Sequence, residues 1–114
     1  MAARLAADFK AAAEEKAASG GRLITALSGG HTPKSFFEVL AEPPYRDSVP
    51  WDNVIFFWGD ERCVPPDDDE SNFKMTNLAL LSHIPIPEQN VHRVLGENPP
   101  EEEAERYADV IRKF

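Results

Sequence analysis

The sequence predicts an α/β fold, namely the N-terminal part of a doubly wound, mostly parallel sheet with helices on both faces. Two runs, residues 22–27 and 53–58, are largely apolar, which is typical of short strands buried on both faces of a sheet. Longer segments with apolar residues at helical spacing alternate with these runs. Strands that alternate with helices pair in parallel and are covered on two sides.

The first half of the chain predicts a helix, a strand, a second helix and a second strand. Residues 2–19 carry apolar side chains at a 3.6-residue period and end at Gly20, a common helix terminator. After the strand at 22–27, residues 34–42 are helical in pattern, and Pro43 stops that helix.

The second half predicts two more helices around a short third strand. Ser71 is suited to cap a helix that continues to about Ile84 and ends before Pro85. Residues 91–94 suggest a strand, and the acids at the start of 98–114 are typical of a helix N-terminus. The last helix ends where a further strand is expected, so residues 1–114 read as the first part of a larger domain.

Composition and charge exclude several classes of function. The chain is 42% hydrophobic and 28% charged, as in soluble globular domains, and it contains no apolar run of the roughly 18 residues that span a membrane. The lone Cys63 cannot form an intrachain disulfide, so we expect a cytoplasmic protein. A net charge of -8 argues against binding nucleic acid or an anionic membrane. An anionic small molecule would need a local site of backbone amides and one or two cations.

The turn after the first strand has the features of such a site. Gly29 and Gly30 let backbone amides approach a ligand, and the next helix points its free N–H groups at the same place. Thr32 is suited to cap that helix and Pro33 to its first position. Lys34 is unfavourable in a first helical turn unless an anion binds beside it. The alternatives are a tight strand–helix connection without a ligand and a solvated surface lysine.

A second loop, residues 59–65, follows the second strand and ends at the same edge of the predicted sheet. Ligands of open α/β sheets bind at the carboxyl ends of the strands. Arg62 in this loop can hold phosphate oxygens through two parallel hydrogen bonds. The alternative is a structural ion pair of Arg62 with Asp60 or Glu61.

These residues resemble 6-phosphogluconolactonases over most of the chain. Three motifs carry the resemblance: Ser28-Gly29-Gly30-x-Thr32-Pro33, Gly59-Asp60-Glu61-Arg62-x-Val64-Pro65 and Ser71-Asn72. The resemblance implies a Rossmann-like fold and hydrolysis of 6-phosphoglucono-δ-lactone to 6-phosphogluconate in the oxidative pentose phosphate pathway. The implied partner is a phosphorylated sugar lactone, without metal or organic cofactor. The substrate-binding residues that it implies are Ser28, Gly29, Gly30, Thr32, Lys34, Arg62 and Asn72.

The catalytic part of the resemblance is missing. The family's histidine lies in a Gly-x-Asp-Gly-His segment, and these 114 residues contain none. The histidines are His31, where the family commonly shows serine, His83 and His92, and none has the context of a general base. We therefore expect no catalytic residue in this chain and no activity of the chain alone. The alternatives are an amino-sugar-phosphate isomerase or deaminase, and a non-catalytic sugar-phosphate-binding half-domain.

Other reactive residue types have simpler interpretations. The acidic run at 67–70 lacks the alternating spacing of a calcium loop and is typical of a solvated turn. Cys63 has no recognisable base beside it. Asp60 and Glu61 are not expected to form an acid/base pair. A sheet with an open edge predicts self-association.

Overall fold

The computed structural model describes residues 2–28 and 31–114; the side chains of residues 31 and 32 also lie outside that description. The helices and strands in chain order are α1 (Ala2–Ala18), β1 (Leu23–Leu27), α2 (His31–Leu40), α3 (Tyr45–Ser48), η1 (Trp51–Asn53), β2 (Val54–Trp58), α4 (Asn72–Ala79), η2 (Leu81–His83), η3 (Glu88–Asn90), β3 (Val91–His92) and α5 (Pro100–Arg112).

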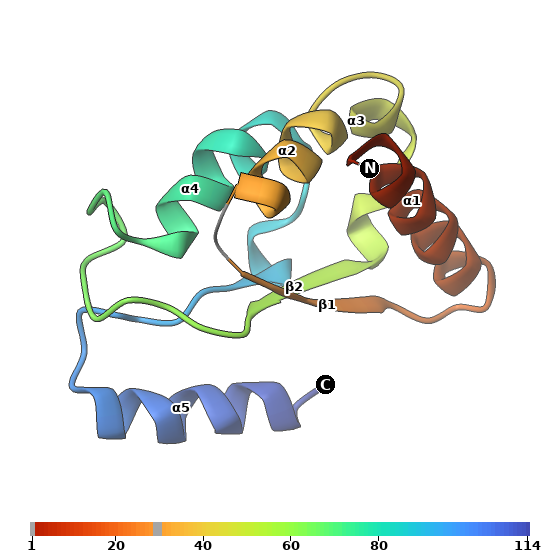
Figure 1. The fold of residues 1–114 in the computed structure, drawn as a ribbon. Coiled ribbons are helices and arrows are strands. Elements are labelled where there is room, and N and C mark those ends of the chain that lie inside the picture. The colour runs from red at the N-terminus through yellow and green to blue at the C-terminus, as the bar shows by residue number, and fades with distance from the viewer. Residues whose placement is uncertain (1, 29–30) are drawn as a thin grey trace.

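The three described strands form one parallel sheet in the order β1-β2-β3. Helices α1 to α4 lie on one face of this sheet, and of the described helices only α5 lies on the other (Figure 1). This is the predicted α/β arrangement with helices on both faces. Every residue of β2 is buried, because β2 is the central strand and is covered from both sides.

The two faces of the sheet hold separate apolar clusters. The larger lies under α1, α2 and α4 and is centred on aromatic side chains, with Phe9 stacked on Phe56 at 6.1 Å between ring centroids. The smaller contains Ile55, Phe57 and Tyr107 beneath α5. Alternate residues of β2 therefore belong to different clusters, because successive side chains of a strand point to opposite faces of the sheet.

Some element boundaries differ from the sequence prediction. Helix α2 begins at His31, so Thr32 lies inside the helix instead of capping it, and Pro33 is not its first residue; shifts of one or two residues at helix ends are common. The helix predicted to reach Ile84 ends at Ala79, where Leu80 leaves helical geometry with φ -134°, and η2 follows.

The third strand is shorter than predicted. β3 contains two residues, not four, and pairs with β2 at Phe56 and Phe57. The Tyr107 hydroxyl, on α5, lies between the next two backbone groups of the ladder: it accepts the Trp58 N–H at 2.7 Å and donates to the His92 carbonyl oxygen at 2.6 Å. Because α5 thus takes the donor and the acceptor that a longer ladder would pair, the strand ends early. The sequence also gave no indication of α3 and η1.

β1 is covered less completely than β2. In the described part of the chain β1 pairs only with β2, and α5 lies beneath β2 and β3. Ile24 stands opposite the buried Ile55 in the register yet is 51% exposed. Among the described helices none is long and apolar enough to cross a membrane.

Candidate functional site

The carboxyl ends of β1 and β2 lie side by side. Leu27 stands opposite Trp58 in the register, and the Gly59 N–H donates to the Leu27 carbonyl oxygen at 2.9 Å. The turns that follow the two strands therefore start at one edge of the sheet, as the sequence predicted. Ser28 is exposed at this edge. Gly29, Gly30 and the Thr32 side chain lie outside the described residues.

Glu61 joins the loop after β2 to the first turn of α4. Its Oε1 accepts the backbone N–H of Asn72 at 2.7 Å, and its Oε2 accepts the backbone N–H of Phe73 at 3.0 Å and the Ser71 hydroxyl at 2.9 Å. The first N–H groups of a helix lack partners within the helix, and a carboxylate there is favoured by the helix dipole. Sequence reasoning missed this role.

The N-cap residue and Glu61 satisfy different donors at the start of α4. Ser71 is the N-cap, as predicted, and its Oγ accepts the Lys74 N–H at 3.2 Å. A capping box would place Glu or Gln at position 74 to accept the Ser71 backbone N–H, but Lys74 stands there, and that N–H donates to the Asp68 carbonyl oxygen at 3.0 Å. The Lys74 ammonium pairs with Asp69 at 2.6 Å.

Among the described residues, most of the hydrogen-bonding groups of the Arg62 side chain have no partner. Its Nη1 donates to the Glu70 carbonyl oxygen at 3.3 Å, and none of the five ion pairs found among the described residues includes it. Glu61 accepts the backbone N–H of Arg62 at 2.8 Å, not its guanidinium. The alternative of a structural ion pair with Asp60 or Glu61 is therefore wrong. An exposed guanidinium without a carboxylate partner is suited to an anion.

Asn72 has a structural position. It is 5% exposed, and its Nδ2 donates to the Asp60 carbonyl oxygen at 3.3 Å. Its own carbonyl oxygen accepts the Thr76 hydroxyl at 3.0 Å. The bond to Asp60 ties the loop after β2 to α4, and a ligand contact from Asn72 stays a prediction.

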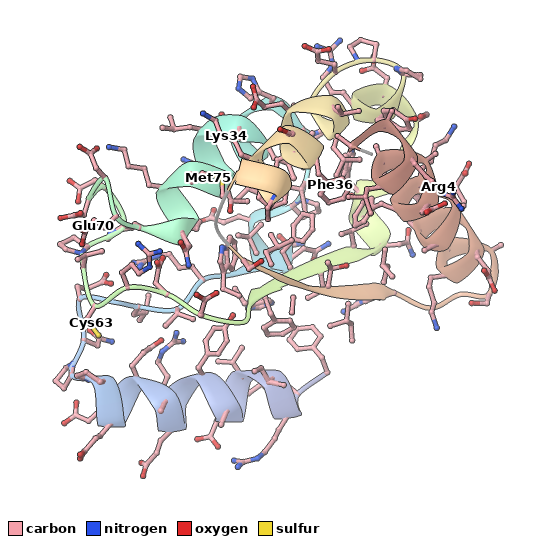
Figure 2. The ribbon with its side chains drawn as sticks, viewed as in Figure 1. Arg4, Lys34, Phe36, Cys63, Glu70 and Met75 are labelled. Carbon is pink, nitrogen blue, oxygen red and sulfur yellow. The ribbon has the colours of Figure 1, made fainter. Side chains whose placement is uncertain are left out.

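Lys34 lies apart from Arg62. It lines a groove of about 700 Å³ between α2 and α4, together with Lys74 and Met75, and Figure 2 shows Lys34 and Met75 close together on these two helices. Arg62 instead lines a cavity of about 370 Å³ between the loop after β2 and α5. Neither of these two cavities is lined by both cations.

Tyr107 anchors the wall of the Arg62 cavity. Its hydroxyl accepts the Trp58 backbone N–H at 2.7 Å and donates to the His92 carbonyl oxygen at 2.6 Å. Burial raises the pKa of Tyr107, so the hydroxyl keeps its proton at neutral pH. α5 is thereby fixed to the ends of β2 and β3.

The described histidines have packing or surface positions. The His92 ring stacks on Phe57 at 5.0 Å and contacts Phe114, and burial lowers its pKa. His83 is exposed, with Nε2 3.0 Å from the Leu78 carbonyl oxygen. Both match the sequence interpretation, and the side chain of His31 lies outside the described residues.

The acidic run forms a turn. Asp68 accepts the backbone N–H of Glu70 at 2.9 Å, and Asp69 pairs with Lys74, whose ammonium lowers the pKa of Asp69. Among residues 2–28 and 31–114, no group of three His, Cys, Asp or Glu side chains is arranged to hold a metal ion. Cys63 is a free, exposed thiol on the loop that also carries Glu70 (Figure 2).

Comparisons with known proteins extend over the whole chain. The family described as glucosamine-6-phosphate isomerases/6-phosphogluconolactonase matches residues 1–114. A 6-phosphogluconolactonase of Haemophilus influenzae is 48% identical over 85 residues, which are 75% of this chain and 37% of the relative. One of Treponema pallidum is 46% identical over 89 residues, 78% of this chain and 36% of the relative.

Solved structures agree with the sequence comparison. The crystal structure of 6-phosphogluconolactonase from Thermotoga maritima has a TM-score of 0.86 and 35% identity over 98% of this chain and 50% of that one. A monomeric glucosamine-6-phosphate deaminase with 23% identity and a TM-score of 0.78 shares the fold. The chain thus spans half or less of the length of these relatives. Since the family match includes every residue, this chain belongs to the glucosamine-6-phosphate isomerase/6-phosphogluconolactonase family.

Proposed function

We propose that this chain supplies the phosphate-binding loops of a 6-phosphogluconolactonase, which hydrolyses 6-phosphoglucono-δ-lactone to 6-phosphogluconate. The observation that carries the proposal is the Arg62 guanidinium. It is exposed in the loop after β2 with a single described hydrogen bond of 3.3 Å, at the sheet edge where the turn after β1 also begins. Such a guanidinium can bind two phosphate oxygens at once.

The phosphate is the expected anchor of the substrate. This acidic chain repels anions at long range, so a phosphate ester needs several local donors. Arg62 supplies the cation, and the first backbone N–H groups of α2, which begins at His31, are the further donors in the proposal. Lys34, Ser28 and Asn72 are weaker companions in the proposal, since Lys34 lines a different groove and Asn72 is already bonded to Asp60.

The chemical step needs a group that the described residues do not offer. Attack of water on the lactone carbonyl needs a general base within hydrogen-bond reach. His92 is packed between aromatic rings and His83 lies on the far groove. We therefore propose that this chain binds the substrate and that the base comes from a Gly-x-Asp-Gly-His segment outside these 114 residues.

The lactonase is favoured over the amino-sugar-phosphate isomerase. Relatives 46–48% identical are named 6-phosphogluconolactonases, whereas the deaminase structure at 23% identity supports the fold alone. A non-catalytic binding module would have the same phosphate site. Only an activity assay with the segment that carries the general base added would distinguish such a module from a lactonase.

We also propose that the chain self-associates through β1. Its outer edge has no partner strand among the described residues, and no charged residue lies within Leu23–Leu27. An apolar strand edge without charges is prone to pair with another chain, and the partner that we propose is a second copy.

The test of the binding site is a thermal shift with matched ligands. A ligand that binds the folded state raises the melting temperature by mass action. We expect 6-phosphogluconate to raise it and gluconate, which lacks the phosphate, to leave it unchanged. Equal effects of the two compounds, or none at saturating concentration, would contradict the proposed site.

A further inference from the structure

We infer that Glu61 and Gly96 are positioning residues for Arg62. Glu61 fixes the loop after β2 to α4, and Gly96, in the loop after β3, leaves room for the backbone of Arg62. The inference rests on the proposed function, in which Arg62 binds the phosphate. Neither residue touches the ligand in this account. Both act on the path of the backbone that carries the guanidinium.

The Arg62 side chain is held weakly, so its position depends on the backbone. Its guanidinium has one described hydrogen bond, of 3.3 Å, to a carbonyl oxygen. A bidentate contact requires both N–H groups to point at the ligand. Misplacement by about 1 Å is enough to weaken such a contact strongly.

Glu61 holds the backbone of Arg62 through a hydrogen bond. The Oε1 atom that accepts the Asn72 N–H at 2.7 Å also accepts the Arg62 N–H at 2.8 Å. One carboxylate oxygen therefore connects the residue that carries the guanidinium to the first turn of α4. A glutamine amide has one oxygen, so Glu61→Gln must present an N–H₂ group to some of these donors.

Gly96 lies directly against the backbone of the Arg62–Val64 segment. A Cβ atom at this position would lie 2.5 Å from the Val64 carbonyl oxygen and would overlap the carbonyl oxygen of Arg62. These are backbone atoms, which cannot swing away as a side chain can. Any residue other than glycine at position 96 must therefore displace the Arg62–Val64 segment or the loop after β3.

The loop after β3 cannot yield easily, because α5 holds it. Glu103 is 4% exposed, and its carboxylate accepts the Leu95 backbone N–H at 2.7 Å. The Arg106 guanidinium binds both the Glu103 carboxylate and the Arg93 carbonyl oxygen. A side chain at position 96 is thus expected to move the loop that carries Arg62 more than it moves the loop after β3.

The experiment is a double-mutant cycle on 6-phosphogluconate binding, measured by calorimetry with the 114-residue chain. We expect Gly96→Ala to weaken binding about tenfold, within the usual range of coupling between neighbouring residues. In the Arg62→Ala background it should have no further effect. Gly21→Ala is the control, because a Cβ there meets its nearest atom at an ordinary 3.6 Å. Glu61→Gln is run in parallel and decides the question should Gly96→Ala fail to fold.

The outcomes separate this inference from the proposed function. Equal weakening with and without Arg62, or unchanged affinity of both variants, would overturn the positioning role. Unchanged affinity of Arg62→Ala would instead overturn the proposed site. The NMR shift of the Arg62 Nε–H group gives a reading that needs no ligand: it should move in Gly96→Ala and stay in Gly21→Ala. A resonance that stays in both would also contradict the inference.

Discussion

The backbone N–H of Asn72 donates a 2.7 Å hydrogen bond to the carboxylate of Glu61, eleven positions earlier in the chain. This bond joins the loop that carries Arg62 to the helix that follows it. Because the same carboxylate also accepts the Arg62 N–H, the start of α4 and the proposed phosphate contact share one anchor. Stability and ligand binding are therefore expected to respond together when Glu61 changes.

Glu61→Ala should lower the free energy of unfolding by about 2 kcal/mol, since it removes charged acceptors from several donors at a helix start. Urea denaturation followed by circular dichroism measures this change. Glu105→Ala, at an exposed position of α5, is the control and should change it by less than about 0.5 kcal/mol. Equal values for both variants would show that Glu61 does not stabilise α4.

Glu103 should make stability depend on pH in the acid range. The Arg106 guanidinium, together with the Leu95 N–H, holds the pKa of Glu103 below its ordinary 4.5. A depressed pKa in the folded state adds stability above the unfolded pKa, and this stability is lost as the pH falls through the folded value. We expect Glu103→Gln to cost about 2 kcal/mol at pH 7 and progressively less as the pH falls below 4.5.

The control for Glu103 is Glu97, which also pairs with an arginine. Arg93 lowers the pKa of Glu97 to about 2, but the Glu97 side chain is 37% exposed. Water and salt screen such a pair, so Glu97→Gln should cost only about 0–1 kcal/mol. If the two variants showed the same cost at pH 7, burial of Glu103 would not be the source of its effect.

Ile24→Lys should reduce the proposed self-association. Ile24 is 51% exposed on β1, and a lysine on an edge strand opposes pairing with another chain. Sedimentation velocity over a range of concentrations measures the effect. Leu78→Lys changes another exposed apolar residue, 62% exposed on α4, and should leave the association unchanged. A chain that stays monomeric at all concentrations would contradict the proposal.

The chain alone should not accelerate lactone hydrolysis. Binding the phosphate holds ground and transition states about equally, which leaves the chemical step unchanged. The assay follows 6-phosphoglucono-δ-lactone and subtracts its spontaneous hydrolysis. Turnover well above that background which His31→Ala abolishes would show that His31 acts as the base.

The fold followed from local patterns, whereas the anchors of the site did not. The apolar runs located β1 and β2 to within one residue, because short apolar runs between turn signals are typical of strands, although only β2 is buried throughout. Ser71 was visible as a helix cap from its type and position. Glu61 acts on a helix that begins eleven residues later, and its capping role has no local signature. Glycine is needed at position 96 only because the loop after β3 contacts the loop after β2. The spacing of residue types along the sequence does not indicate this contact.

The most direct test of the account is the dissociation constant of 6-phosphogluconate for the unaltered chain, Arg62→Lys and Arg62→Ala, measured by calorimetry. We expect weaker binding in Arg62→Lys, because a point charge replaces the planar fork, and weaker binding still in Arg62→Ala. A loss of about 2 kcal/mol in Arg62→Ala, the usual size for a charged hydrogen bond, would agree with a bidentate phosphate contact. Equal dissociation constants for all three chains would contradict it and place the phosphate elsewhere.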